Sequence, residues 1–281
     1  MNVTRVRSRV DRFSSLPSVS EVILRLMEML EDPNLSIREI GEVLGQDPGL
    51  TARVLKAVNS PIYGFIGRIS SVTQALLLLG LNSVKGILVS ICANDLMKKS
   101  MTGLWEHSMG AAVMVKAIAN KKHLSLGEET SIAALLHDLG KVVLFVSFPD
   151  DYAKALQLAE SEKIFIREAE ERCFETTHAQ VGEWVAKKWN FPRSLIEPVR
   201  YHHRPELGKS YPIQCAALHV SDALVRATGF GFPGDLLVPP IDPAALTALN
   251  LSDKEVEEIL EEAQPQLEEA RDFWAMGDED H

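Results

Sequence analysis

Helical spacing of the apolar residues runs along nearly the whole chain and is the feature that most limits its fold. In "SEVILRLMEMLEDP", residues 20–33, the apolar side chains recur three and four positions apart, so they share one face of a helix. The same spacing recurs in later segments, and no alternating pattern typical of a strand competes with it. The sequence therefore predicts an all-α fold, a multi-helix bundle.

Capping and breaking residues place the ends of these helices. Two capping boxes are predicted, one at Ser36 and one at Ser252, each with a glutamate three residues later. Gly80 indicates a turn between two apolar helices. Pro265 lies inside the last, acidic helix, and we expect it to kink or break that helix.

The chain divides into three predicted parts. A weak boundary falls at "MKKSMTG", residues 97–103, and a stretch rich in glycine and proline, residues 229–243, is typical of a wrapped loop or linker. We predict an N-terminal helical lobe over residues 1–98, a second helical lobe over residues 99–232, and a loop with an acidic C-terminal helix over residues 233–281.

Charge and cysteine content exclude some classes of function. A formal net charge of -10 argues against nonspecific binding to nucleic acid or to anionic membranes, because both need positive charge. The longest apolar stretch, residues 75–93, is interrupted by Asn82, Ser83 and Lys85, so we expect no membrane span. The 3 cysteines form no CxxC pair, which favours a reducing cytoplasm.

Residues 36–59 have the helix, turn, helix pattern of some DNA-binding proteins. Their second helix would offer Arg53 and Lys56 to base edges. Helix pairs with short turns are also common packing units, and the acidic balance of the chain favours that interpretation.

A histidine and an aspartate interrupt the apolar run "AALLHDLGKVVLF", residues 133–145. Charged groups such as Asp138 are rarely buried unless they are paired or bind a metal. Adjacent residues on a helix point about 100° apart, so His137 and Asp138 at a helix end or bend can approach one centre from two sides. The pair is the first candidate for a metal site.

Further imidazoles and carboxylates lie in comparable settings. His107 and Asp222 stand among apolar residues, and His202 and His203 form a second adjacent pair. Such groups without a thiolate suit Fe, Mn, Zn or Mg. They are more than one ion needs, and sites with two metals favour hydrolysis of phosphate esters.

Lys141 shares a helix face with the first pair, since it lies four residues after His137 and three after Asp138. It could hold a substrate phosphate. Equally, it could be the ion-pair partner of Asp138 or a solvated cation.

The motif "HDLGK", residues 137–141, with His107 upstream and Asp222 downstream, resembles the H…HD…D signature of the HD superfamily of metal-dependent phosphohydrolases. The N-terminal half, with "LPSVSEVILRLMEMLEDPNLSIREIGEVLGQDPGLTARVLKAVNSPIYG" and "ISSVTQALLLLGLNSVKGILV", resembles the HDOD family of bacterial output domains. "THAQVGEWVAKKWNFPRSLIEPVRYHHRP" and "HVSDAL" continue the match, so the resemblance covers about residues 14–228.

The resemblance implies a bacterial signalling module, with an N-terminal helical lobe packed on an HD-like lobe, that acts mainly through protein partners. It also implies one or two divalent transition metals, with Fe or Mn favoured over Zn, Ni or Mg. The ligand set it implies for one ion, together with the extra ligands of two-metal HD-GYP phosphodiesterases, is His107, His137, Asp138, Asp222, His178, His202 and His203.

The Gly-Tyr-Pro tripeptide of the HD-GYP enzymes is missing, because "RPELGKSYP" follows "YHH". The alternative function is an active phosphohydrolase or phosphodiesterase on a phosphate ester or cyclic nucleotide. In that case Asp138 would orient the reacting groups, and Lys141 would neutralise phosphate charge. The sequence leaves the substrate, the partner protein and the oligomeric state open.

Overall fold

The computed structural model describes residues 2–11, 25, 29, 32, 34–44, 47–60 and 69–275. No strand occurs among these residues, which confirms the all-α prediction. In chain order the helices are α1 (Val3–Val10), α3 (Ile37–Leu44), α4 (Pro48–Val58), α5 (Val72–Leu79), α6 (Leu81–Ser100), α7 (Leu104–Lys122), α8 (Glu128–Leu136), α9 (Leu139–Ser147), α10 (Pro149–Glu162), α11 (Ile166–Phe174), α12 (His178–Lys188), α13 (Arg193–Tyr201), a 3₁₀ turn η1 (Pro205–Leu207), α14 (Pro212–Ala227), α15 (Pro243–Leu249) and α16 (Asp253–Ala275). The helix predicted over residues 20–33 lies largely outside the described residues.

The predicted helix ends are confirmed where the structure describes them. The Ser36 backbone N–H donates to the Glu39 carboxylate at 2.9 Å, and Ser252 makes the same bond to Glu255 at 2.9 Å. Gly80 has a φ of 78° between α5 and α6, a conformation that favours glycine. These bonds satisfy backbone donors that a helix start otherwise leaves unpaired.

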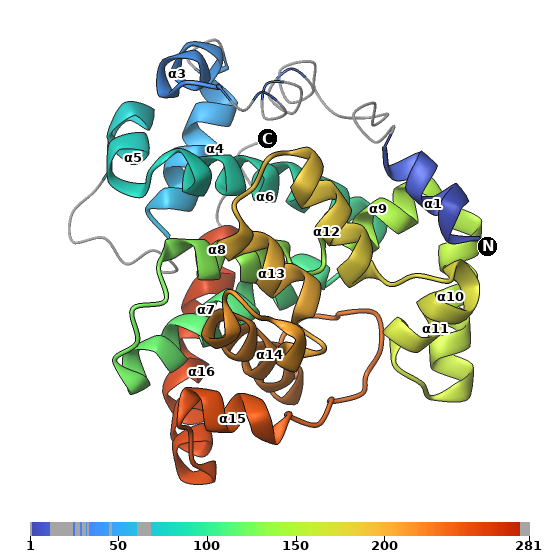
Figure 1. Cartoon of the computed structure of the whole chain (residues 1–281). Coiled ribbons are helices and arrows are strands. Elements are labelled where there is room, and N and C mark those ends of the chain that lie inside the picture. Colours follow the sequence, from blue (N-terminus) through green and yellow to red (C-terminus); the bar gives the residue numbers. More distant parts are fainter. Residues whose placement is uncertain are drawn as a thin grey trace.

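Helix α6 lies between the N-terminal helices and the second helical lobe and contacts both. It packs against α4 and α5 on the N-terminal side and against α7, α8 and α9 on the other (Figure 1). Arg53 of α4 donates to the Ile91 carbonyl of α6 at 3.1 Å, so this side chain is used for packing. An N-terminal helical lobe therefore packs on a second helical lobe, while the boundaries at residues 98 and 232 remain predictions.

Helix α7 is the centre of the second lobe, because α8, α14 and α16 all pack around it. Almost all of its side chains from Leu104 to Ile118 are buried. At Gly110, an added Cβ would lie 2.3 Å from a Val225 methyl group, so α14 approaches the bare backbone there. This close packing holds α7 and α14 at the distance that the site requires.

The apolar segment Glu128–Ser147 is the one stretch among the described residues whose length and composition would suit a membrane span. However, 83% of its apolar window is buried inside the protein. The segment is also divided, since α8 ends at Leu136 and α9 begins at Leu139. It is a pair of core helices with a bend between them.

Pro265 does not end the last helix, contrary to one of the two outcomes expected from the sequence. Helix α16 continues through it to Ala275, and its face with Ile259 and Leu267 is buried against α7. Lys121 of α7 also pairs with Glu258 at 2.8 Å. An internal proline costs about 3 kcal/mol, and the packing of this face offsets that cost.

The stretch rich in glycine and proline forms a wrapped loop, as predicted, and we call residues 229–242 the strap. The Phe232 backbone N–H donates to the Gly103 carbonyl at 2.8 Å, which ties the strap to the start of α7. Gly231 has a φ of 77°, and an added Cβ there would lie 2.2 Å from the His107 backbone nitrogen. Asp235 accepts the Ile166 N–H at 2.8 Å, so the strap also reaches α11.

Candidate metal centre

The structure brings all seven predicted ligands into one buried cluster. His107 lies on α7, Asp222 on α14, and His178 is the first residue of α12. The remaining four lie at helix ends: His137 and Asp138 between α8 and α9, and His202 and His203 directly after α13. All are buried except the half-buried His203.

Gly140 allows the elements of the cluster to meet. An added Cβ at this position would lie 2.0 Å from the His178 carbonyl oxygen, so α9 and the start of α12 are in contact at their backbones. No other residue type fits such an approach without movement of one helix. As a result, Asp138 Oδ1 lies 3.4 Å from His178 Nε2.

Three side chains form what we call the inner group: His107, His137 and Asp222. The two Nε2 atoms are 3.2 Å apart, and His107 Nε2 lies 3.1 Å from Asp222 Oδ1. Asp138 borders the group, with Oδ2 3.3 Å from His137 Nε2. Their side chains are at most 3% exposed, so this group is closed to solvent.

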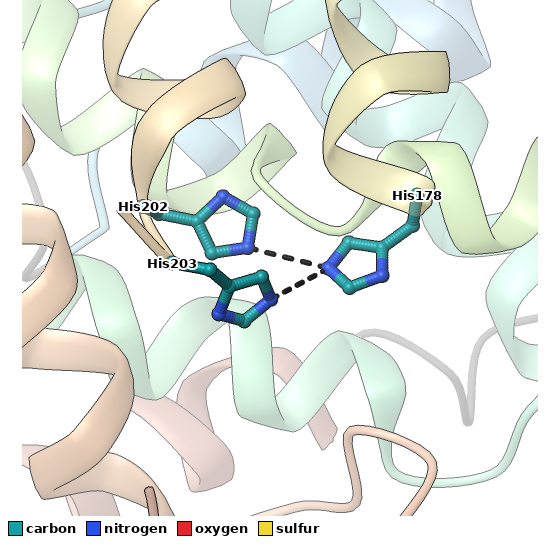
Figure 2. A group of neighbouring side chains, drawn as sticks. All are labelled: His178, His202 and His203. Carbon is teal, nitrogen blue, oxygen red and sulfur yellow. Dashed lines mark hydrogen bonds between the residues drawn. The ribbon is translucent and has the colours of Figure 1, made fainter. Parts of the chain in front are cut away.

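Three histidines form the outer group: His178, His202 and His203. Figure 2 shows His178 approaching from one helix and the adjacent pair from another. The His178 Nε2 atom lies 2.9 Å from His203 Nε2 and 3.3 Å from His202 Nε2. The His203 side chain is 15% exposed, so the cluster reaches solvent on this side.

Hydrogen bonds to the far sides of the rings turn their lone pairs inward. The Nδ1 atoms of His137 and His202 donate to the carbonyls of Ala134 and Val199 at 2.6 and 2.8 Å. A carbonyl only accepts, so in the neutral form of each ring the hydrogen is on Nδ1 and Nε2 carries a lone pair.

His178 is held in the same way by a carboxylate. Its Nδ1 lies 2.6 Å from Glu170 Oε2, so the neutral ring also carries its hydrogen on Nδ1. When both rings are in this form, the lone pairs of His178 and His202 face each other at 3.3 Å with no hydrogen between them. A metal ion would satisfy both, and the residues present fit one.

Most pKa shifts in the cluster, with His137 as the exception, favour the charge states that metal binding requires. Burial, reinforced by the neighbouring histidines, holds the pKa of His202 and of His203 well below the usual value. Burial opposes ionisation of Asp138, but the charges of His137 and Lys141 outweigh it and hold the pKa of Asp138 well below its usual range. Neutral imidazoles and ionised carboxylates are the forms that bind metals.

His107 and His137 respond differently to the same carboxylates. Burial lowers the pKa of His107, although Asp222 opposes this effect. For His137, burial also favours the neutral form, but Asp138 outweighs it and the pKa is raised. For Asp222, burial raises the pKa, but the His107 hydrogen bond outweighs it, so the pKa lies well below its usual value.

Lys141 lies against Asp138 and the strap. Its Nζ donates to Asp138 Oδ2 and to the Pro233 carbonyl, both at 2.7 Å, and the side chain is buried. Of the two interpretations that the sequence allowed, this arrangement is the ion pair with Asp138.

Two residues behind His178, Glu170 and Tyr152, are not among the site residues predicted from the sequence. Glu170 is fully buried and accepts the His178 backbone N–H at 2.8 Å as well as its ring N–H. The Tyr152 hydroxyl donates to the other Glu170 oxygen at 3.0 Å. Glu170 stands in a run of charged residues on α11. The apolar Phe174, one helical turn further along and buried on the same face, is the signal in the sequence that hints at its inward position.

His219 lies behind the cluster. Its Nδ1 donates to the His202 carbonyl at 2.8 Å, and its Nε2 accepts the Asp242 N–H at 2.9 Å. Both ring nitrogens are therefore used, and the residue positions the second histidine pair and anchors the end of the strap.

Solved structures resemble this chain over nearly its full length. An HDOD domain protein of unknown function from Geobacter sulfurreducens is 28% identical, with a TM-score of 0.67 over 96% of this chain and 97% of that one. A candidate phosphohydrolase from Shewanella amazonensis SB2B is 18% identical, with a TM-score of 0.66 over 95% of this chain and 97% of that one. At that identity the second likeness shows the fold alone.

A curated relative, an uncharacterised protein of Treponema pallidum (strain Nichols), is 25% identical over 224 residues. The match covers 78% of this chain and 44% of the relative, so the chain spans less than half the length of that protein. The family model of the HDOD domain matches residues 16–205, which include most of the N-terminal lobe and six of the seven cluster residues, all but Asp222. On this match, and with the helical architecture of the HDOD protein from Geobacter, the chain belongs to the HDOD family.

Proposed function

We propose that the cluster holds one or two divalent transition metals and that the chain is a cytoplasmic bacterial signalling protein acting mainly through protein partners. The observation that carries the metal is the approach of His178 Nε2 and His202 Nε2, 3.3 Å apart, with both hydrogens held on the far side. Fe or Mn suits this mixture of imidazoles and carboxylates best, and Zn, Ni or Mg would be alternatives.

Each group of the cluster offers a set of ligands for one ion. The inner group, with Asp138 beside it, combines imidazole and carboxylate ligands, and the outer group offers three imidazoles. In each group the candidate ligand atoms lie within 4.8 Å of one another. His137, Asp138 and His202 form a third such set between them, so Asp138 is the residue best placed to serve both ions.

The closed inner group favours a role through partners. Its side chains are at most 3% exposed, and the strap crosses the adjacent side through the bond between Lys141 and the Pro233 carbonyl. A substrate at this group would require the strap to move. A metal there would instead fix the positions of α7, α8 and α14. A partner protein that binds the surface of these helices could then respond to whether the metal is bound.

Metal analysis of the anaerobically purified protein tests the proposal. We expect between one and two equivalents of a transition metal, and a loss of at least one equivalent in Asp138→Ala. Asp150→Ala, which removes an exposed carboxylate on α10, is the matched control and keeps the wild-type content. Less than one equivalent in the wild-type protein would contradict the metal site.

A second candidate function is hydrolysis of a phosphate ester. The observation that favours it is a cavity of about 170 Å³ that reaches His203 and is lined by three arginines as well as three glutamates. Two bound metals would supply Lewis acidity and an activated water. Around them, Asp138 would hold the geometry through its contacts to His137 and His178, and the strap would exclude bulk water from the inner side.

Turnover separates the two candidates. The metal-loaded protein is assayed against phosphate monoesters and cyclic dinucleotides, beside Asp138→Ala and Asp150→Ala. Inert protein with full metal content is the result expected of a signalling module. Metal-dependent hydrolysis that only Asp138→Ala abolishes would establish the enzyme and displace the first proposal.

A further inference from the structure

A cavity opens where the outer group reaches the surface. It has a volume of about 170 Å³ and lies between α11, the start of α12 and the end of α13. His203 forms its inner wall, and its side chain is the most exposed of the cluster at 15%. The strap closes the cluster at Lys141, whereas the cavity offers a small molecule a route to the outer group.

Two arginines line the cavity without a partner. Arg167, on α11, is half-buried, and Arg204, just after the histidine pair, is exposed. Neither makes an ion pair or a side-chain hydrogen bond with any residue that the structure describes. By contrast, the third arginine, Arg200, pairs with Glu183 at 3.1 Å. Two unpaired guanidinium groups beside a candidate metal ligand form a site for an anion with several oxygens.

The first turn of α12 forms another wall, with Thr177 and Ala179 facing the cavity. Thr177 is the N-cap and makes no side-chain capping bond. The start of a helix carries backbone N–H groups and partial positive charge, which adds to the attraction of the arginines for an anion.

Carboxylates from α11 complete the lining. Glu168, Glu171 and Glu175 face the same cavity, so its wall is not uniformly positive. A ligand that fits this wall carries its negative charge at one end and hydroxyl or ammonium donors at the other. A phosphate monoester of a small hydroxylated carrier has that distribution.

The volume of the cavity limits the size of the ligand. Pockets for drug-sized molecules usually hold about 300–1,000 Å³. A space of about 170 Å³ lies below that range, so it suits a phosphate with a short carrier better than both bases of a cyclic dinucleotide.

We propose that this cavity binds the phosphate group of a small phosphate monoester, held by Arg167 and Arg204 beside the outer group. The inference deepens the proposed function and rests on it for the metal, while the arginines and the cavity belong to the chain itself. The phosphate monoester would be the molecule that this chain senses as a signalling protein, or the substrate that it hydrolyses as an enzyme.

Calorimetric titration with inorganic phosphate tests the site in the full chain. Metal-loaded protein and chelator-treated protein are titrated separately, beside Arg204→Ala, Arg167→Ala and the double variant. We expect phosphate to bind the wild-type protein at least tenfold more tightly than the double variant, with the metal content unchanged. Because Arg204 is exposed, its single variant is expected to fold and to weaken binding severalfold on its own.

Arg172→Ala is the matched control. Arg172 lies on the same helix as Arg167 but does not line the cavity and pairs with Glu162. Its phosphate affinity should remain within twofold of the wild type. Equal affinity in the double variant and the wild type, or no binding of phosphate to either form of the wild-type protein, would overturn the inference.

Two further measurements distinguish a failure of the metal proposal from a failure of the phosphate-site proposal. If the protein as purified contains no metal but still binds phosphate through the two arginines, the phosphate site is supported and the metal proposal is contradicted. Glycerol phosphate should bind more tightly than inorganic phosphate, and cyclic di-GMP should not displace either. Displacement by the dinucleotide would overturn the assignment to a small monoester.

Discussion

The inner and outer groups are built from the same imidazole chemistry but differ in charge and access. The inner group includes Asp222, borders Asp138 and Lys141, and is sealed by the strap. The outer group consists of three histidines, with Asp138 beside it at 3.4 Å from His178, and has an opening at His203. The inner arrangement suits a tightly held metal ion. The outer arrangement suits an ion that exchanges with solvent or binds an external ligand.

The contacts behind the rings differ at His178, while the outer His202, like the inner His137, is held by a backbone carbonyl. His137 of the inner group is held by the backbone carbonyl of its own helix end, which cannot move without α8. His178 of the outer group is held by Glu170, which Tyr152 supports in turn. A side chain can be exchanged without a change of fold, so the outer group is the part of the site that single substitutions can adjust.

The largest effect is expected when the two groups are forced apart. Gly140→Ala places a Cβ 2.0 Å from the His178 carbonyl oxygen, and the backbones of α9 and α12 must separate. We expect a loss of about 3 kcal/mol in the free energy of unfolding, measured by urea denaturation. Overpacking costs about 1–3 kcal/mol, and the upper value applies because a backbone atom cannot move aside as a side chain can. The outer ligands should lose their metal as well.

Gly41→Ala is the control for that substitution. Gly41 lies in α3, and nothing stands within 4 Å of its added Cβ. Alanine is favoured over glycine in a helix by about 0.5–1 kcal/mol, so this variant should be as stable as the wild type or more stable. Wild-type stability of Gly140→Ala would show that the two helices are not in close contact.

Removal of one ligand from each group tests the difference in access directly. We expect a chelator to withdraw metal from the wild-type protein in two phases, the fast phase belonging to the outer group. His203→Ala should remove the fast phase and leave the slow one, and His107→Ala should remove the slow phase. The measurement is the metal content remaining on the protein against time, and a single phase in the wild type with two bound equivalents would contradict the division.

A smaller effect is expected from the residue behind the outer group. Glu170→Gln keeps the shape of the side chain but removes the charge that supports His178. Loss of such a partner typically costs about 10–100-fold in metal affinity, so the outer ion should be weakened by that factor while the inner ion is unchanged. Tyr152→Phe, which removes only the hydroxyl donor to Glu170, should weaken the outer ion less. Equal weakening of both ions by Glu170→Gln would show that the groups do not act separately.

Local signals in the sequence were reliable for the fold. The capping boxes at Ser36 and Ser252 depend on residues three positions apart, and both are formed. The turn at Gly80 depends on one residue's backbone freedom, and it too is present. Of the two outcomes expected at Pro265, a break does not occur, because the local cost of a proline is visible in the sequence and the packing of α16 on α7 is not.

The site was predictable in its members and not in its arrangement. His137 and Asp138 were conspicuous as polar groups in an apolar run, and resemblance supplied their companions. Glu170 could not be singled out, since it looks like its solvated neighbours on α11 and its inward position depends on where α12 begins.

By itself the sequence determined the helical class, the order of the helices and the residue types of the cluster, because these depend on contacts within one or two turns. Only the tertiary structure decided that Lys141 pairs with Asp138 and with the strap 92 positions away, and that Glu170 supports His178. It also decided which side of the cluster opens to solvent. Such contacts depend on how separate helices cross, and a crossing is set by close approaches such as that at Gly140, whose partner atoms are remote in the chain.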